Sequence, residues 1–262
     1  MPAESFLRFV RRLALAFAAL LALVAPAAAA DAQGGPKELL IAYRAQPADR
    51  PAFRAYLLGE ETAFFEGLKR DGVLKSYQVL FNPFVTGTWD AMTVLSFTNY
   101  GATARWKEIE RTRPGGLSAA GLKLAKPLET YSADLGWEGV AAEAGAPAKR
   151  IVYVIPYSYT ALDQYKSYVD AYVIPQVKGW MAEGVLSRYA LYLNRDPVGD
   201  PWDALFVYEY RDQESFGRRE EVVAKVRAPL REDPTWKHWN DIKATVRSET
   251  QNTQAEILSP AK

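Results

Sequence analysis

One stretch of sequence occurs twice in this chain, and this repeat constrains the fold more than any other feature. The first copy spans residues 67–82 and the second spans residues 179–194, and matching Gly, Val, Leu, Tyr and Asn residues lie 112 positions apart. A Trp-Asp-Ala triplet follows in both copies, beginning at Trp89 and at Trp202, 113 positions apart. A constant spacing over so many positions indicates duplication. We therefore expect two structurally similar units within one chain.

The first thirty residues have the pattern of a secretion signal. Three arginines at positions 8, 11 and 12 precede an apolar run at 13–25, and small residues follow up to Ala30. A basic segment, a short apolar core and small residues before a cleavage point are typical of such signals. The apolar run is shorter than the about 20 residues that a membrane span needs. We expect cleavage after Ala30, a periplasmic or secreted mature protein, and no stable membrane span after cleavage.

Charge and cysteine content exclude several classes of protein. The formal net charge is +1, and removal of three arginines and Glu4 with the signal changes it to −1. A near-neutral chain offers no broad basic surface, so we expect no nucleic-acid partner. The absence of cysteine excludes disulfides, thiolate metal sites and cysteine nucleophiles. The chain that remains is long enough for two domains of about 100 residues each, held together by hydrophobic cores.

Hydrophobic periodicity predicts the same order of elements in both copies. In the first copy we expect strands at 37–45, 74–81, 89–98 and 128–135, and helices at 51–72, 101–112 and 117–126. The strands at 74–81 and 89–98 are expected to form a hairpin. In the second copy we expect strands at 151–157, 186–193, 202–210 and 253–258, and helices at 161–182, 213–230 and 235–247. The strands at 186–193 and 202–210 are expected to form a hairpin, and Pro175 is expected to kink the first helix. The order β-α-β-β-α-β is that of a ferredoxin-like unit. The chain therefore divides into a signal at 1–30, a leader at 31–36, a first unit at 37–137, a linker at 138–149 and a second unit at 150–258.

The strands of both copies carry apolar side chains on both faces. In the strand at 202–210, aromatic residues and Ala204 alternate with Leu205 and Val207. Helices can cover only one face of such a sheet, and burying each large apolar side chain of the other face contributes about 1.5–3 kcal/mol. We therefore expect an α+β fold in which two tandem ferredoxin-like units pack sheet to sheet as an intrachain α+β barrel.

In element order, in the duplication and in the Gly-Val-Leu sequence that opens the second strand, residues 37–258 resemble the dimeric α+β barrel superfamily. The resemblance is to the version in which two ferredoxin-like units are fused in tandem. It implies a fold and says little about function, because the superfamily includes cofactor-free monooxygenases, haem-degrading and haem-peroxidase-like enzymes, stress-response proteins and members without known activity. In these proteins, ligand sites usually lie between sheet and helices or within the barrel.

Trp89 and Trp202 are the best-marked candidate site residues. They would line a pocket at the ends of the two hairpins, with Asp90 and Asp203 as acid or base groups. Alternatively, each tryptophan anchors the core and each aspartate brackets a turn. The duplication favours the structural role, because a fold constraint acts on both copies whereas a site usually needs only one.

The other candidates are tyrosines and the single histidine. Tyrosine hydroxyls in an apolar cavity suit an aromatic or quinone-like ligand, although packing is the alternative interpretation. His238 is the only histidine. It is either a single axial haem ligand or a helix-surface residue, and the first strands lack the asparagine that haem-degrading relatives use with tryptophan and histidine. The candidate ligand-binding residues are Trp89, Trp202, Tyr77, Tyr189, Tyr208, Tyr210 and His238.

These observations predict a protein that binds a small apolar or aromatic ligand or a protein partner. The alternatives are a cofactor-free monooxygenase-like enzyme acting on an aromatic substrate, or a haem-binding protein that uses His238. No P-loop, dinucleotide fingerprint or zinc-ligand spacing is present, so we expect no metal site and no cofactor other than haem in that alternative. The sequence does not decide between enzyme and binding protein, or between monomer and homo-oligomer.

Overall fold

The computed structural model describes residues 38–142 and 149–258. The predicted secretion signal at 1–30, the leader at 31–36 and residues 143–148 of the predicted linker lie outside the described residues. Within the two described ranges, no helix is long and apolar enough to cross a bilayer.

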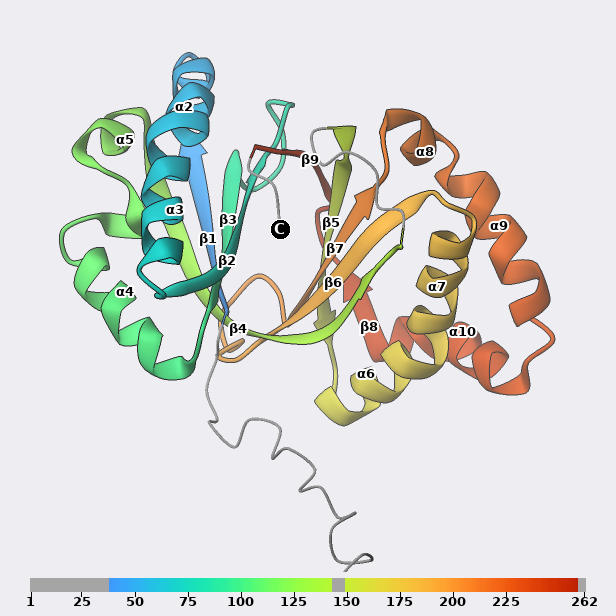
Figure 1. Cartoon of the computed structure of the whole chain (residues 1–262). Helices are drawn as coiled ribbons and strands as arrows, with labels where there is room; N and C mark the ends of the chain where they lie inside the picture. The colour runs from blue at the N-terminus through green and yellow to red at the C-terminus, as the bar shows by residue number, and fades with distance from the viewer. Residues whose placement is uncertain (1–37, 143–148, 259–262) are drawn as a thin grey trace, which may run out of the picture. The chain divides into compact units, whose positions relative to one another are not determined.

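Both copies have the predicted order of strands and helices (Figure 1). The elements of the first copy are β1 (Glu38–Ala45), α2 (Arg50–Tyr56), η1 (Leu57–Glu61), α3 (Thr62–Arg70), β2 (Leu74–Phe81), β3 (Ala91–Phe97), η2 (Tyr100–Ala102), α4 (Thr103–Glu110), η3 (Pro114–Gly116), α5 (Ala119–Leu124) and β4 (Ala125–Val140). β4 extends beyond its predicted end, into the range expected to be linker, because its last residues pair with the second copy.

The second copy differs from the first in its fourth strand, which is broken in two. Its elements are β5 (Ile151–Tyr159), α6 (Leu162–Tyr168), η5 (Val169–Val173), α7 (Ile174–Ala182), β6 (Leu186–Asn194), β7 (Ala204–Tyr210), α8 (Gln213–Gly217), α9 (Arg219–Leu230), α10 (Pro234–Val246), β8 (Arg247–Glu249) and β9 (Thr253–Ile257). β8 was not predicted, because three residues are too few to show a period. β9 agrees with the predicted last strand.

The strands form one closed antiparallel ring, in the order β7-β6-β4-β1-β3-β2-β9-β5, and β5 pairs again with β7. Two seams join the copies. β4 pairs with β6 from Ala133↔Asn194 to Val140↔Arg188, and β2 pairs with β9 only through Leu80↔Ile257 and Phe81↔Glu256. The predicted intrachain α+β barrel is therefore confirmed, with the two sheets joined along their edges as well as facing one another.

Alternation along the strands creates a separate core on each side of the barrel wall. Ile41 and Tyr43 of β1 pack against helices of the first copy, whereas Leu40 and Ala42 face the barrel interior. The interior cluster combines residues of both copies, including Leu40, Leu80, Val94, Val152, Ala190 and Val207. The expectation that both faces of the strands are buried is met.

Each copy has a π-helical turn at the same point of its first long helix, η1 at Leu57–Glu61 and η5 at Val169–Val173. We predicted a kink at Pro175, which follows η5 directly. The position that matches Pro175 in the first copy is Ala63, 112 residues earlier, and the same π-helical turn forms there without proline. The irregularity therefore belongs to the duplicated unit and does not depend on Pro175.

The π-helical turn of the first copy places Glu61 in the core, where the second copy has Val173. The Glu61 side chain has 0% exposure and accepts a hydrogen bond of 2.6 Å from the Tyr56 hydroxyl. Arg113 lies 3.4 Å from the same carboxylate oxygen, and the other oxygen has no partner in the described part of the chain. Desolvation raises the pKa of Glu61 to about 7. The folded protein therefore retains a proton that an unfolded chain would release at lower pH.

We predict that Glu61 makes folding less favourable as the pH rises. Its pKa rises from 4.5 to about 7 on folding. Stability should therefore fall through this group between these values, by about 3 kcal/mol at about 1.4 kcal/mol per pKa unit. Urea unfolding at about pH 5 and about pH 8 should show a smaller decline for Glu61→Gln than for the wild type.

The matched control is Glu60→Gln, which changes the exposed neighbour. It should retain most of the wild-type decline, because desolvation contributes more to the raised pKa of Glu61 than the charge of Glu60 does. Other buried acids such as Glu38 titrate in both proteins, so only the difference between the curves reports on Glu61. Parallel curves for Glu61→Gln and wild type would contradict the assignment.

Candidate functional site

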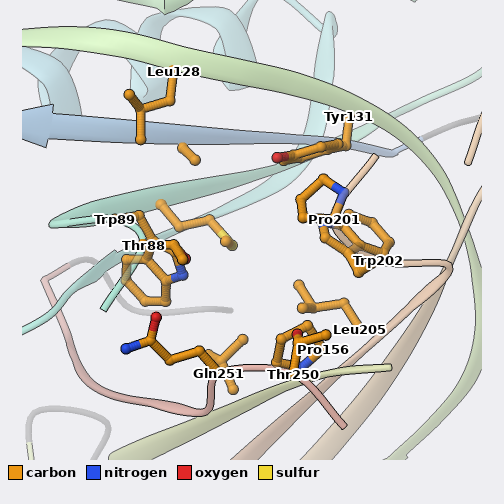
Figure 2. A pocket seen from close by; sticks show the side chains of 13 residues that line it. Thr88, Trp89, Leu128, Tyr131, Pro156, Pro201, Trp202, Leu205, Thr250 and Gln251 are labelled. Atoms are coloured by element: carbon orange, nitrogen blue, oxygen red, sulfur yellow. The ribbon is translucent and has the colours of Figure 1, made fainter. Parts of the chain in front are cut away.

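A pocket of about 390 Å³ lies at the end of the barrel interior where the β2–β3 and β6–β7 hairpins turn. Figure 2 shows Trp89 and Trp202 on opposite sides of it. The pocket is lined by Ala42, Thr88, Trp89, Met92, Leu128, Tyr131, Val154, Pro156, Pro201, Trp202, Leu205, Thr250 and Gln251.

Most of the lining consists of matched residues from the two copies. The strand registers define the matches, because Tyr43 faces Ala91 and Pro127 while Tyr157 faces Ala204 and Glu249. The matched lining pairs are Ala42 and Pro156, Thr88 and Pro201, Trp89 and Trp202, Met92 and Leu205, and Leu128 and Thr250. The pocket therefore lies where the copies meet, and each copy contributes an equivalent wall.

An asparagine at the end of each hairpin strand positions the tryptophan of that hairpin. The Nδ2 atom of Asn82 donates to the Trp89 carbonyl at 3.4 Å, and the Nδ2 atom of Asn194 donates to the Trp202 carbonyl at 3.1 Å. Each asparagine Oδ1 also accepts the backbone N–H two residues further on, which is typical of an Asx turn. The duplicated asparagines thus explain why both indoles are presented to the pocket.

The aspartates of the Trp-Asp-Ala triplets serve the fold. Asp90 accepts the backbone N–H of Ala45 at 2.8 Å, and Asp203 accepts that of Tyr159 at 2.8 Å. Each carboxylate thereby joins a hairpin to the end of the first strand of its copy. Neither aspartate lines the pocket, so neither can act there as an acid or base.

No charged side chain lines the pocket. Its polar side chains are Thr88, Tyr131, Thr250 and Gln251. The Tyr131 ring centroid lies 5.0 Å from that of Trp202, and its hydroxyl is turned toward the pocket (Figure 2). Burial raises the pKa of Tyr131 to about 12, so the hydroxyl remains protonated and available as a donor. An indole N–H can only donate. The pocket thus combines apolar walls with a few polar groups, among them the hydroxyl of Tyr131 and the two indole N–H donors.

The four candidate tyrosines lie outside this pocket. Tyr77 is on the helix side of β2 and donates to Glu66 at 2.8 Å. Tyr189, Tyr208 and Tyr210 belong to the core between the strands and helices of the second copy. Of the predicted ligand-binding residues, the pocket brings together only the two tryptophans, and ligand binding by the tyrosines stays a prediction.

Sequence analysis missed Tyr131, Met92, Leu205 and Gln251 as lining residues. Tyr131 lies in β4, whose register was not derivable from its own sequence because the strand pairs with both copies. The inward positions of β3 and β7 were visible as an alternating pattern, but nothing in that pattern distinguishes a filled core from a pocket wall.

No known family model and no curated protein matches the chain. Several solved structures resemble it. A monooxygenase-like protein from Lactobacillus acidophilus aligns with a TM-score of 0.57 and 13% identity, over 87% of this chain and 97% of that one. An anthrone oxidase-like protein aligns with a TM-score of 0.51 and 9% identity, over 84% and 91%. A chlorite dismutase from Candidatus Nitrospira defluvii aligns with a TM-score of 0.50 and 10% identity, over 85% and 90%.

The chain has the dimeric α+β barrel fold. At these identities the likeness concerns the fold alone. In the dimeric α+β barrel, as in this chain, sheets of two ferredoxin-like units enclose a common interior, here within a single polypeptide.

Because the dimeric α+β barrel superfamily includes haem proteins, the surroundings of His238 bear on whether it could hold haem. His238 is exposed on α10, and its ring centroid lies 5.4 Å from that of Trp239. It does not line the barrel pocket or the space between the strands and helices of the second copy, and the described residues contain no group of three or more potential metal ligands. The space between β5, β7, α7 and α9 is about 60 Å³, enough for a few waters. The surroundings of His238 do not fit haem.

We predict that His238 does not bind haem iron. Titration of the purified protein with haemin should give the same Soret spectrum for wild type and His238→Ala, because the imidazole is exposed on α10 and does not line the barrel pocket. Trp239→Phe, which changes the neighbouring ring, serves as a control for nonspecific haemin adsorption on this helix. A Soret shift that is present in wild type and lost only in His238→Ala would overturn the assignment.

Proposed function

We propose that the protein binds a small, neutral aromatic ligand bearing a hydrogen-bond acceptor in the pocket between the two copies. The matched pair Trp89 and Trp202 on opposite walls supports this proposal most directly. A cavity of about 390 Å³ lies within the range of small-molecule sites, which are mostly apolar with few polar groups. Opposed indoles favour a planar ring through stacked or edge-on contacts.

The polar groups narrow the ligand class. A carboxylate or an ammonium ion would lose its hydration without gaining a counter-charge, since the lining contains no charged side chain. Tyr131 offers a donor with no partner of its own in the described residues. An aromatic ketone, ether or similar acceptor matches these groups.

The side chains that line the pocket favour binding over oxygenase catalysis. A cofactor-free oxygenase needs a group that removes a proton from its aromatic substrate, with a pKa near the operating pH. The lining contains no histidine, carboxylate or lysine, and the pKa of Tyr131, about 12, keeps it protonated. The pocket can position an aromatic compound but supplies no base.

Binding can be tested with prodan, a neutral naphthalene ketone whose fluorescence shifts to the blue in an apolar site. We expect saturable binding, with Trp89→Leu and Trp202→Leu each raising Kd about tenfold, which corresponds to about 1.4 kcal/mol. Tyr131→Phe should raise Kd about fivefold, since a neutral hydrogen bond contributes about 1 kcal/mol.

Trp137→Phe is the matched control, because Trp137 lies on β4 outside the pocket and donates to Asp170. It should leave the Kd for prodan unchanged. Equal affinity in wild type, Trp89→Leu and Trp202→Leu would contradict the proposed site.

The enzyme alternative can be tested separately with anthrone, the compound after which one of the structural neighbours is named. We expect oxygen uptake by anthrone to proceed at the same rate with and without the protein, because the pocket supplies no base. A rate increase that is lost in Tyr131→Phe would instead establish an oxygenase that uses this hydroxyl.

A further inference from the structure

The hairpin loop of the first copy is held in place by two arginines. Arg50, the first residue of α2, is 6% exposed. It forms an ion pair with Asp90 and donates to the carbonyls of Asn82 and, at 3.0 Å, Phe84. Arg44 donates to the Gly87 carbonyl at 2.7 Å and lies 3.5 Å from Asp90. Charge-assisted hydrogen bonds of this kind are among the strongest in proteins.

The hairpin loop of the second copy lacks both arginines. Leu162, the first residue of α6, corresponds to Arg50, the first residue of α2. Ser158 corresponds to Arg44, because the residue after each donates its backbone N–H to the hairpin aspartate. Asp203 has no ion-pair partner among the residues the structure describes.

The base of this second loop is bonded to β4, because the Arg195 N–H donates to the Ser132 carbonyl and its Nε donates to Asp134 at 3.0 Å. The tip of the loop, residues 197–201, has few anchors. Asn194 donates to Asp200 at 2.7 Å, and the Asp200 N–H donates to Pro197 within the loop. Val198 is 98% exposed. In residues 38–142 and 149–258, no side chain of β5 or α6 bonds to this tip. Segments with few buried contacts are those that open locally.

Each loop ends on one wall of the pocket, with Trp89 after the first loop and Trp202 after the second. The loop before Trp89 is therefore held by two arginines, whereas the tip before Trp202 is held by neither an arginine nor a lysine in the described residues. The interaction of Trp202 with Tyr131, at 5.0 Å between ring centroids, lies within the pocket, so it is the contact that a ligand would replace or extend.

We propose that the pocket is filled through movement of residues 197–201 together with Trp202, while Arg44 and Arg50 hold Trp89 as the fixed wall. The proposal rests on the proposed function, because it assigns a route to the same pocket. Arg44 and Arg50 are positioning residues, since neither lines the pocket and both act through the loop that precedes Trp89.

Amide hydrogen exchange in the protein without ligand tests the difference between the loops. We expect the exchangeable amides of 196–200 to exchange about tenfold faster than those of 84–88, because arginines bond to the carbonyls of Phe84 and Gly87, whereas no arginine or lysine in the described residues bonds to residues 197–201. In the triple variant Arg44→Ser/Arg50→Leu/Asp90→Asn, which copies Ser158 and Leu162 and leaves no buried unpaired charge, residues 84–88 should exchange as fast as 196–200. Equal exchange of the two loops in wild type would overturn the proposal.

The converse test adds an arginine next to the second loop. Leu162→Arg places a guanidinium opposite Asp203, as Arg50 is opposite Asp90, and should slow prodan association about tenfold in stopped-flow fluorescence. The matched control is Leu122→Arg, since Leu122 is equally exposed at 39% but lies on α5, outside the pocket lining. An unchanged association rate in Leu162→Arg, with exchange of 196–200 slowed, would overturn the proposal.

The absence of cysteine allows a direct measurement of which loop moves. Nitroxide labels on Val198→Cys and on Val85→Cys, both at exposed loop positions, should report reduced mobility on prodan binding at 198 and no change at 85. The reverse pattern, or equal changes, would refute the moving wall. If prodan fails to bind wild type, the proposed function fails, and hydrogen exchange still decides whether the loops differ.

Discussion

The whole structure depends on hydrogen bonding between the edge strands of the two copies. A ferredoxin-like sheet has two edges and one face that its own helices cannot cover. Pairing of β4 with β6 and of β2 with β9 removes the edges of both sheets and encloses the uncovered faces in the same step. The barrel interior, the pocket and the placement of both tryptophans follow from this closure, because none of them exists within a single copy.

Closure around an axis that relates the copies also changes the meaning of a repeated residue. In two independent domains, a residue found twice would serve the fold twice. In a closed barrel, matched residues that face the interior lie on opposite sides of the same space, so a duplicated tryptophan supplies two walls of one cavity. The duplication of Trp89 and Trp202 in the sequence favours a structural role when the copies are considered as separate units, and their shared barrel adds this second possibility. Both roles are compatible, since Asn82 and Asn194 fix the backbone of each indole as part of the turn.

Much of the fold was predictable because local patterns agree with the tertiary structure. The alternation in β1, β3 and β7 gave both buried faces, and the repeat gave the number of units. The break between β8 and β9 was not predictable, because each piece is short and its pairing with β5 is decided by distant residues. For the site, the tryptophans were identified by their repeated triplets, whereas Tyr131 depends on the register of β4, which no local pattern specifies.

The unequal lengths of the two seams bear on how the chain is made. The β4–β6 seam can form once the middle of the chain has been synthesised, but the short β2–β9 seam needs the last described strand. Until β9 pairs with it, β2 retains an open edge beside an apolar interior, which is a surface prone to association with other chains. The barrel therefore closes only when the last described strand pairs, and the few residues of β9 cover the exposed edge of β2.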